Sequence, residues 1–205
     1  TGPDDPMAIF YLIHARAYLE ESIALCRELG PAQTWDLAMA LGSHGNAIMY
    51  LGDGQALKTV AEESFALFEQ LEDEWGMGLT RCLFGETHLL AHDYPEACSC
   101  FEEAVRLLGQ TGDKWAIGVA LMDWGYTNSL LGDLVSARMH LEESIALHRS
   151  IGERFIRSLS LNILAQVVQQ QNDAQMAITL YSESLDLLRK MGMEASIADV
   201  QYNLA

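Results

Sequence analysis

The chain repeats itself every 40 residues, and this period constrains its fold more than any other feature. An aromatic residue recurs with this step at Trp35, Trp75, Trp115 and Phe155. A dipeptide that ends in aspartate recurs with the same step at Gly52-Asp53, His92-Asp93, Gly132-Asp133 and Asn172-Asp173. A period of this length is typical of a repeat architecture, in which each repeat packs only on its neighbours.

Each period predicts two helices, because apolar residues recur at helical spacing and no stretch alternates as a strand would. Glycine ends one helix and the aspartate after it caps the next. First helices are expected at 35–51, 74–91, 114–131 and 154–171, and second helices at 54–71, 94–109, 134–151 and 174–191. A helix at 7–29 is expected to be the second half of an incomplete repeat.

These helices predict one all-α solenoid over 1–205. It consists of a partial repeat at 7–30, repeats at about 34–73, 74–113, 114–153 and 154–193, and a partial repeat at 194–205. Because the last helical pattern stops in mid-course, we expect the chain to be a piece of a longer protein.

Small residues recur where the two helices of a repeat would cross. In the first helices they are Gly45, Gly85, Gly125 and Ala165, and in the second helices Ala15, Ala97, Ala137 and Ala177. Leu57 departs from this pattern because it is large. Four positions later the repeats carry a large residue, at Leu19, Phe101, Leu141 and Tyr181, whereas Ala61 is small. We interpret the two departures as compensating changes in side-chain volume.

At these residues the chain resembles the tetratricopeptide repeat family, which implies a right-handed superhelical solenoid of antiparallel helix pairs. The period is longer than the usual 34 residues of that family. This longer form resembles the arrays of bacterial signalling ATPases and of MalT-like transcriptional activators, and also eukaryotic adaptor arrays.

The charge excludes several classes of partner. The chain has 29 acidic and 12 basic residues and a net charge of -17, whereas nucleic acids and anionic membranes attract basic surfaces. The sequence shows no apolar run of about 18 residues, and we expect neither a membrane span nor a signal peptide. Cys26, Cys82, Cys98 and Cys100 form no CxxC pair, so we expect reduced core thiols in a cytoplasmic protein.

Candidate chemistry is sparse. His88 and His92 have the four-residue spacing that can place two imidazoles on one metal, but no third ligand is near in sequence. No phosphate-binding glycine loop and no nucleophile elbow are present. We therefore expect no catalytic site, no metal and no cofactor.

Two recurring features have a structural and a functional interpretation. The tryptophans are expected to wedge between repeats, and the alternative is a ladder that stacks a ligand. The pairs Glu20-Glu21, Glu62-Glu63, Glu102-Glu103 and Glu142-Glu143 are expected to form a solvated ridge on the convex side, with a docking site as the alternative.

In the family that the chain resembles, first helices line a concave groove. The resemblance implies that the groove residues here are Asn46, Met49, Tyr50, Glu86, Leu89, Leu90, Tyr126, Ser129, Leu130, Gln166, Gln169 and Gln170. The positions at which chaperone-binding members carry lysine and arginine hold no cation here, so a chaperone-tail adaptor is not expected.

The expected partner is a protein or peptide, with a small ligand as an alternative, and neither nucleic acid nor membrane. We expect a scaffold or sensor module of a larger bacterial signalling or regulatory protein. The alternative is a stand-alone adaptor that assembles other proteins.

Overall fold

The computed structural model describes residues 6–204, and it describes side chains from residue 13 onwards except that of residue 195. Every α-helix expected from the sequence is present, with ends within two residues of their predicted positions. The helices are α1 (Pro6–Leu29), α2 (Thr34–Tyr50), α3 (Gly54–Gln70), α4 (Glu74–Leu90), α5 (Tyr94–Thr111), α6 (Lys114–Leu131), α7 (Leu134–Ser150), α8 (Phe155–Gln170), α9 (Ala174–Met191) and α10 (Glu194–Leu204). A short 3-10 helix, η1 (Pro31–Gln33), lies in the longer connection after α1. The described residues form no strand, and the all-α prediction is confirmed.

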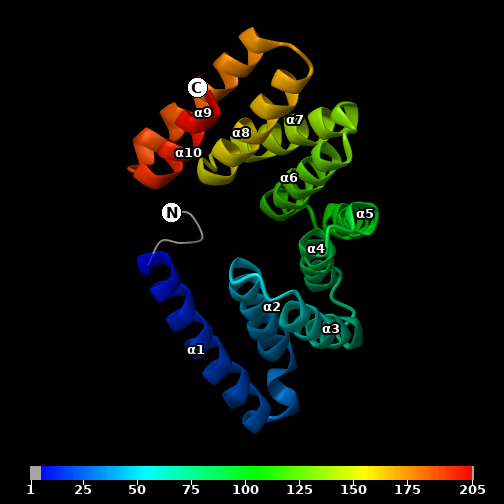
Figure 1. Cartoon of the computed structure of the whole chain (residues 1–205). Coiled ribbons are helices and arrows are strands. Elements are labelled where there is room, and N and C mark those ends of the chain that lie inside the picture. The colour runs from blue at the N-terminus through cyan, green and yellow to red at the C-terminus, as the bar shows by residue number, and fades with distance from the viewer. Residues whose placement is uncertain (1–5, 205) are drawn as a thin grey trace. The chain divides into compact units, whose positions relative to one another are not determined.

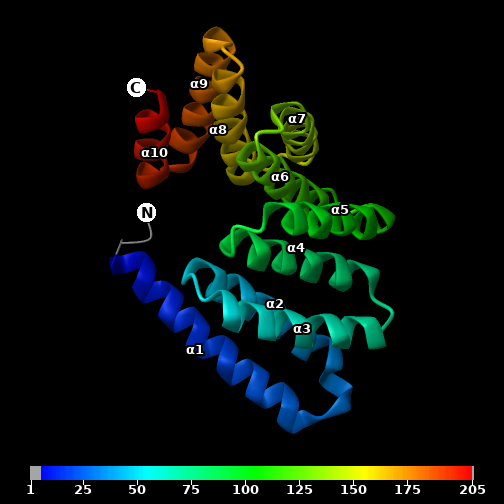
Figure 2. The same cartoon turned by 45° about the vertical axis from the view of Figure 1, so that its right-hand side comes forward.

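The helices form two compact units, residues 1–111 and 112–205. In the first unit α1 packs on α2, α2 on α3, α3 on α4 and α4 on α5; in the second, α6 to α10 pack in the same serial way. Figures 1 and 2 show the helix pairs α2–α3 and α8–α9 lying side by side. Within each unit, successive first helices also touch: α2 contacts α4, and α6 contacts α8. This is the nearest-neighbour packing expected of a repeat array.

The turns between helices follow the predicted glycine and aspartate pattern. Gly52, Gly112, Gly132, Gly152 and Gly192 have positive φ angles, and Glu72, His92 and Asn172 adopt the same left-handed conformation at the equivalent turns that lack glycine. The next residue commonly caps the following helix: the Asp53 carboxylate accepts from Ala56 N at 3.0 Å, and Asp73, Asp113, Asp133 and Asp173 do the same for their helices. These five aspartates each satisfy at least one free N–H group at the start of the helix that follows.

The predicted small positions are points of close helix contact. A Cβ atom on Gly85 would lie 2.6 Å from the Phe101 ring, and one on Gly125 would lie 2.7 Å from Leu141 Cγ. Leu57 and Ala61 are both fully buried, which agrees with the interpretation of compensating volumes. Gly76 and Gly118 are further close contacts that the sequence reasoning missed: their Cβ atoms would clash with Phe68 and His148.

Buried hydroxyl groups join the second helices α3, α7 and α9 to first helices. The hydroxyls of Ser64, Ser144 and Ser184 donate to the carbonyl oxygens of Ala38, Gly118 and Ser158, each 26 residues earlier, at 2.7–2.9 Å. Ser64 and Ser144 also lie near Thr80 and Ser160, in the first helix of the next repeat. These contacts fix the register of neighbouring helices, because a buried hydroxyl without a partner is costly.

No helix among the described residues combines the length and the apolar character that a membrane span requires.

Candidate functional site

The predicted groove residues lie on first helices, and none of them is fully buried. In the first unit, α2 carries Asn46, Met49 and Tyr50, and the neighbouring α4 carries Glu86, Leu89 and Leu90. In the second unit, α6 carries Tyr126, Ser129 and Leu130, and the neighbouring α8 carries Gln166, Gln169 and Gln170. Each unit therefore brings six of these residues together on two adjacent helices.

One repeat position within this set is notable for exposed apolar side chains. Tyr50, Leu90 and Leu130 stand at the carboxyl ends of α2, α4 and α6, 40 residues apart. All three are exposed, and Tyr50 keeps 66% of its surface accessible. Large exposed apolar side chains at one repeated position are typical of a contact surface for another molecule.

Glu86 is the unusual acid of this set. Its side chain is half-buried, and burial raises the pKa of its carboxyl group to about 7, because desolvation disfavours the charged form. Near neutral pH the carboxyl group can therefore donate or accept a hydrogen bond. An ionised surface glutamate can only accept one.

A surface pocket of about 410 Å³ opens in the first unit, where the start of α3 meets the end of α4. Its lining includes Gly54, Lys58, Phe84, Thr87, His88 and Leu90. Leu90 connects the pocket to the predicted groove residues. The sequence reasoning missed this pocket, although glycine at position 54, where Leu134 stands two repeats later, was a signal that could have indicated it.

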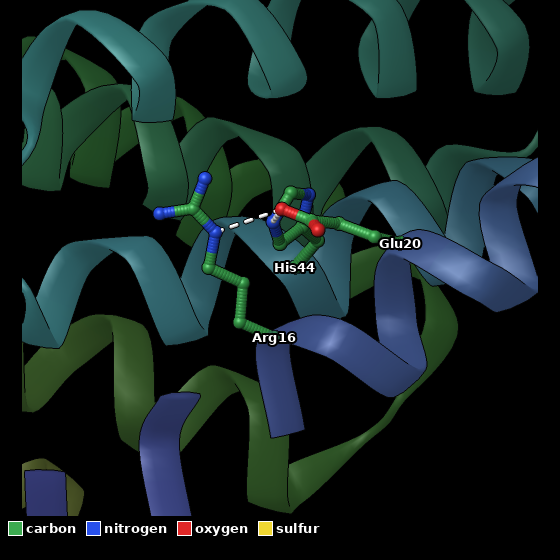
Figure 3. A network of polar contacts seen from close by, with 3 residues as sticks. All are labelled: Arg16, Glu20 and His44. Carbon is green, nitrogen blue, oxygen red and sulfur yellow. Dashed lines mark hydrogen bonds and ion pairs between the residues drawn. The ribbon is translucent and has the colours of Figure 1, made fainter. Parts of the chain in front are cut away.

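A second unpredicted feature lies between α1 and α2 (Figure 3). The imidazole of His44 is buried, with 8% of the residue exposed, and neither ring nitrogen makes a hydrogen bond. The Glu20 carboxylate, held by Arg16 at 2.8 Å, lies 3.7 Å from His44 Nε2. Burial lowers the pKa of His44; the Glu20 charge opposes this shift and the Arg16 charge adds to it. The other repeats place Phe84, Trp124 and Leu164 at this position.

The second unit buries two further histidines. His140 stacks on Trp124 with ring centroids 3.9 Å apart, and its Nδ1 lies 3.1 Å from the Asn128 amide. His148 is fully buried against Gly118, and burial lowers its pKa. Their packing against aromatic, amide and glycine neighbours makes them parts of the core.

The remaining candidate residues have structural surroundings. His88 Nδ1 lies 3.5 Å from an Asp93 carboxylate oxygen, and His92 Nδ1 lies 3.0 Å from the Tyr94 hydroxyl. Within the described chain, no three His, Cys, Asp or Glu residues are placed to hold a metal ion. All four cysteines are half-buried, so none of them is fully enclosed in the core as expected. They lie on faces where the packing of the repeats leaves partial access to solvent.

Two tryptophans are more exposed than wedging between repeats would make them, and some of the acidic pairs form ion pairs. Trp35 and Trp115 are nearly half exposed. The Trp35 indole donates to the Asp73 carboxylate at 2.9 Å, which ties α2 to the start of α4. Among the acidic pairs, Glu63 binds Arg27 and Glu103 binds Arg81. Both ion pairs join different helices, so the acidic surface is partly neutralised by basic neighbours.

Comparison with known proteins identifies the architecture. Residues 117–190 match a family model described as tetratricopeptide repeat. The solved structure of BtubC (BKLC) from P. vanneervenii is similar with a TM-score of 0.79 and 14% identity, covering 94% of this chain and 81% of that chain. The apo form of RapI is similar with a TM-score of 0.76 and 14% identity, over 94% of this chain and 74% of that one.

A further similar structure is the signal transduction ATPase with numerous domains from Pyrococcus horikoshii, whose tetratricopeptide repeats are a sensor. The TM-score is 0.72 and the identity 15%, over 89% of this chain. The chain spans only 28% of that protein. No curated protein sequence matches the chain. Identities this low establish the shared fold alone.

Proposed function

Because the chain is an array of tetratricopeptide repeats, we propose that it binds a peptide or protein segment on the exposed side of its first helices. One observation supports this proposal above the others: Tyr50, Leu90 and Leu130 are large, apolar and exposed at one repeated position. At interfaces a few large anchor residues, tyrosine among them, supply most of the binding energy.

The chemistry beside these anchors favours a peptide over a charged polymer. The neighbouring positions carry the amides of Asn46 and Gln166, the Tyr126 ring and the half-buried Glu86 carboxyl group. Amide and hydroxyl groups can pair with the N–H and C=O groups of a bound backbone. The net charge of -17 disfavours nucleic acid.

We propose further that the array acts as the sensor or scaffold part of a larger bacterial signalling protein. The similarity to the repeat sensor of a multidomain signal transduction ATPase supports this role. A stand-alone adaptor is the second candidate. The two differ in what happens after binding, because a sensor changes the activity of an attached domain and an adaptor only joins its partners.

Capture of the natural partner from a lysate of the source cells tests the binding face. Tyr126→Ala is expected to weaken capture while the free energy of unfolding changes by less than about 0.5 kcal/mol, as is usual for exposed residues. Glu143→Lys, an exposed change on the second helix α7, is the matched control and should leave capture intact. Loss of capture by the control alone would place the binding face on the second helices and overturn the proposal.

A further inference from the structure

The pocket in the first unit has a filled counterpart in the second unit. Gly54 and Ala91 line the pocket, and Leu134 and Gln171 stand at the equivalent positions 80 residues, or two repeats, further along. The Leu134 side chain packs against the hydrophobic core of its unit. The Gln171 amide donates to the Leu134 carbonyl oxygen at 3.1 Å. A leucine side chain and an amide N–H donor thus occupy the place that is open in the first unit.

Charge does not distinguish the two places. Lys58 at the pocket corresponds to Arg138, and each cation lies near a glutamate four residues later: Lys58 near Glu62 at 3.9 Å, and Arg138 near Glu142 at 2.8 Å. The difference lies in volume and polarity. Gly54 and Ala91 are smaller than their equivalents in the second unit, Leu134 and Gln171. The polar residues Thr87 and His88 stand at the positions where the second unit has the buried Val167 and Val168.

The second unit therefore indicates which chemistry fits this position. We infer that the pocket binds a leucine-like side chain of a peptide segment, with an amide N–H of that segment donating to the Gly54 carbonyl as Gln171 does to that of Leu134. A peptide supplies both groups, since every residue except proline carries a backbone N–H. The inference rests on the proposed function, because the pocket would hold one residue of the partner beside Leu90.

The structure allows the pocket to be closed without disturbing the fold. A Cβ atom on Gly54 would lie 3.9 Å from the nearest Leu90 atoms, which is an ordinary contact. The double variant Gly54→Leu/Ala91→Gln copies the residues that fill the second unit. It is expected to keep the unfolding midpoint of the parent chain and to lose the pocket.

The test is an NMR titration of the whole chain with N-acetyl-leucine N-methylamide. We expect saturable shifts of the backbone amides of Thr87, His88 and Leu90, with a Kd on the order of 1 mM. N-acetyl-glycine N-methylamide should bind about tenfold more weakly, because it lacks the apolar side chain. The double variant should show no saturable shift at these residues.

A second double variant makes the opposite change in the second unit, so that the test does not depend on the closed variant alone. Leu134→Ala/Gln171→Ala should open the counterpart and let the leucine amide shift the signals of Val167 and Val168. Absence of shifts in the parent chain, or equal shifts in the parent and the closed variant, would refute the inference. Neither result bears on the first-helix face in general, which partner capture by Tyr126→Ala tests separately.

Discussion

The side-chain oxygens of Ser144 and Ser160 lie 3.0 Å apart in the buried interior of the second unit. The Ser144 hydroxyl also donates to the Gly118 carbonyl oxygen at 2.7 Å. One serine on α7 thus contacts both α6 and α8, and Ser64 makes the corresponding contacts from α3 with Ala38 and Thr80 in the first unit. These polar contacts lie in buried seams between helices, and in the second unit His148 Nδ1 also lies 3.4 Å from the Ser144 hydroxyl oxygen.

Replacement of Ser144 tests the contribution of this contact. Ser144→Ala is expected to lower the free energy of unfolding by about 1–2 kcal/mol, because it leaves the buried Ser160 hydroxyl with one partner fewer. Alanine fits the position, since Ala104 is its native equivalent. Urea denaturation measures the change. Ser182→Ala, which removes an exposed hydroxyl that bonds only within α9, is the control and should change stability by less than about 0.5 kcal/mol.

Helix crossing predicts a second stability effect. Gly125→Leu is expected to destabilise the second unit by about 1–3 kcal/mol, because the added atoms meet Leu141 Cγ and the Ala137 carbonyl oxygen. Gly109→Ala is the control, since a Cβ there meets nothing within 4 Å. It should stabilise α5 by about 0.5–1 kcal/mol. If thermal melting showed the two variants to be equally stable, the crossing would not depend on a small residue.

The turn before α4 offers a stabilising change. Glu72 has a φ angle of 53°, a left-handed conformation that costs a non-glycine residue about 1–2 kcal/mol. Glu72→Gly removes this cost but adds freedom to the unfolded chain, so we expect a net gain of roughly 0.5–1 kcal/mol. Gly112→Ala, at the equivalent turn one repeat later, should lose a similar amount because its φ angle is 72°. Denaturation midpoints that move in the same direction for both variants would contradict this account.

The His44 site predicts a pH dependence. Burial lowers the pKa of His44 in the folded chain below its value in the unfolded chain, so the unfolded state binds the proton more readily. The stability that neutral His44 contributes is present above about pH 6.5 and is lost as the pH falls through the lowered pKa. His44→Phe, which copies Phe84 of the next repeat, should remove this part of the acid sensitivity.

Hydrogen exchange of α1 measured at pH 7.5 and pH 5 reports on this site directly. In the parent chain, the protection factors of the α1 amides, which correct for the slower intrinsic exchange at low pH, should be smaller at pH 5 than at pH 7.5, since α1 supplies the contact with His44. Glu20→Gln is the matched control, because it removes the charge that raises the pKa of His44 and should increase the acid effect. Identical pH profiles for the parent and His44→Phe would show that His44 does not control the packing of α1.

The fold was predictable because its determinants recur. The 40-residue step of Gly52-Asp53 and its equivalents placed the turn within each repeat, and Gly85 and Gly125 placed two helix crossings, because left-handed turns and close crossings favour small residues. Tyr50 and Leu90 could be placed on an exposed face because they stand at the same position of successive repeats, and both are exposed. The repeat position that holds His44 gave no such signal, because it is apolar in the other repeats and its neighbours Glu20 and Arg16 come from a different helix. The pocket at Gly54 exists because glycine has no side chain where Leu134 has one two repeats later. A glycine in the sequence marks this difference, but only the structure shows whether the missing volume stays open.

The seam hydroxyls have a consequence for how such a chain can grow. At Ser64 and Ser144 the serine contacts one residue 26 positions back and another 16 positions forward, and both distances are shorter than the 40-residue period. Duplication of a 40-codon stretch of the gene therefore copies the donor, the acceptor and the spacing between them together. The added repeat would carry a serine at the spacing that pairs with the neighbouring first helices. It would also add one further first helix with its exposed residues. Chains with different numbers of repeats can thus arise by recombination without a new contact having to evolve.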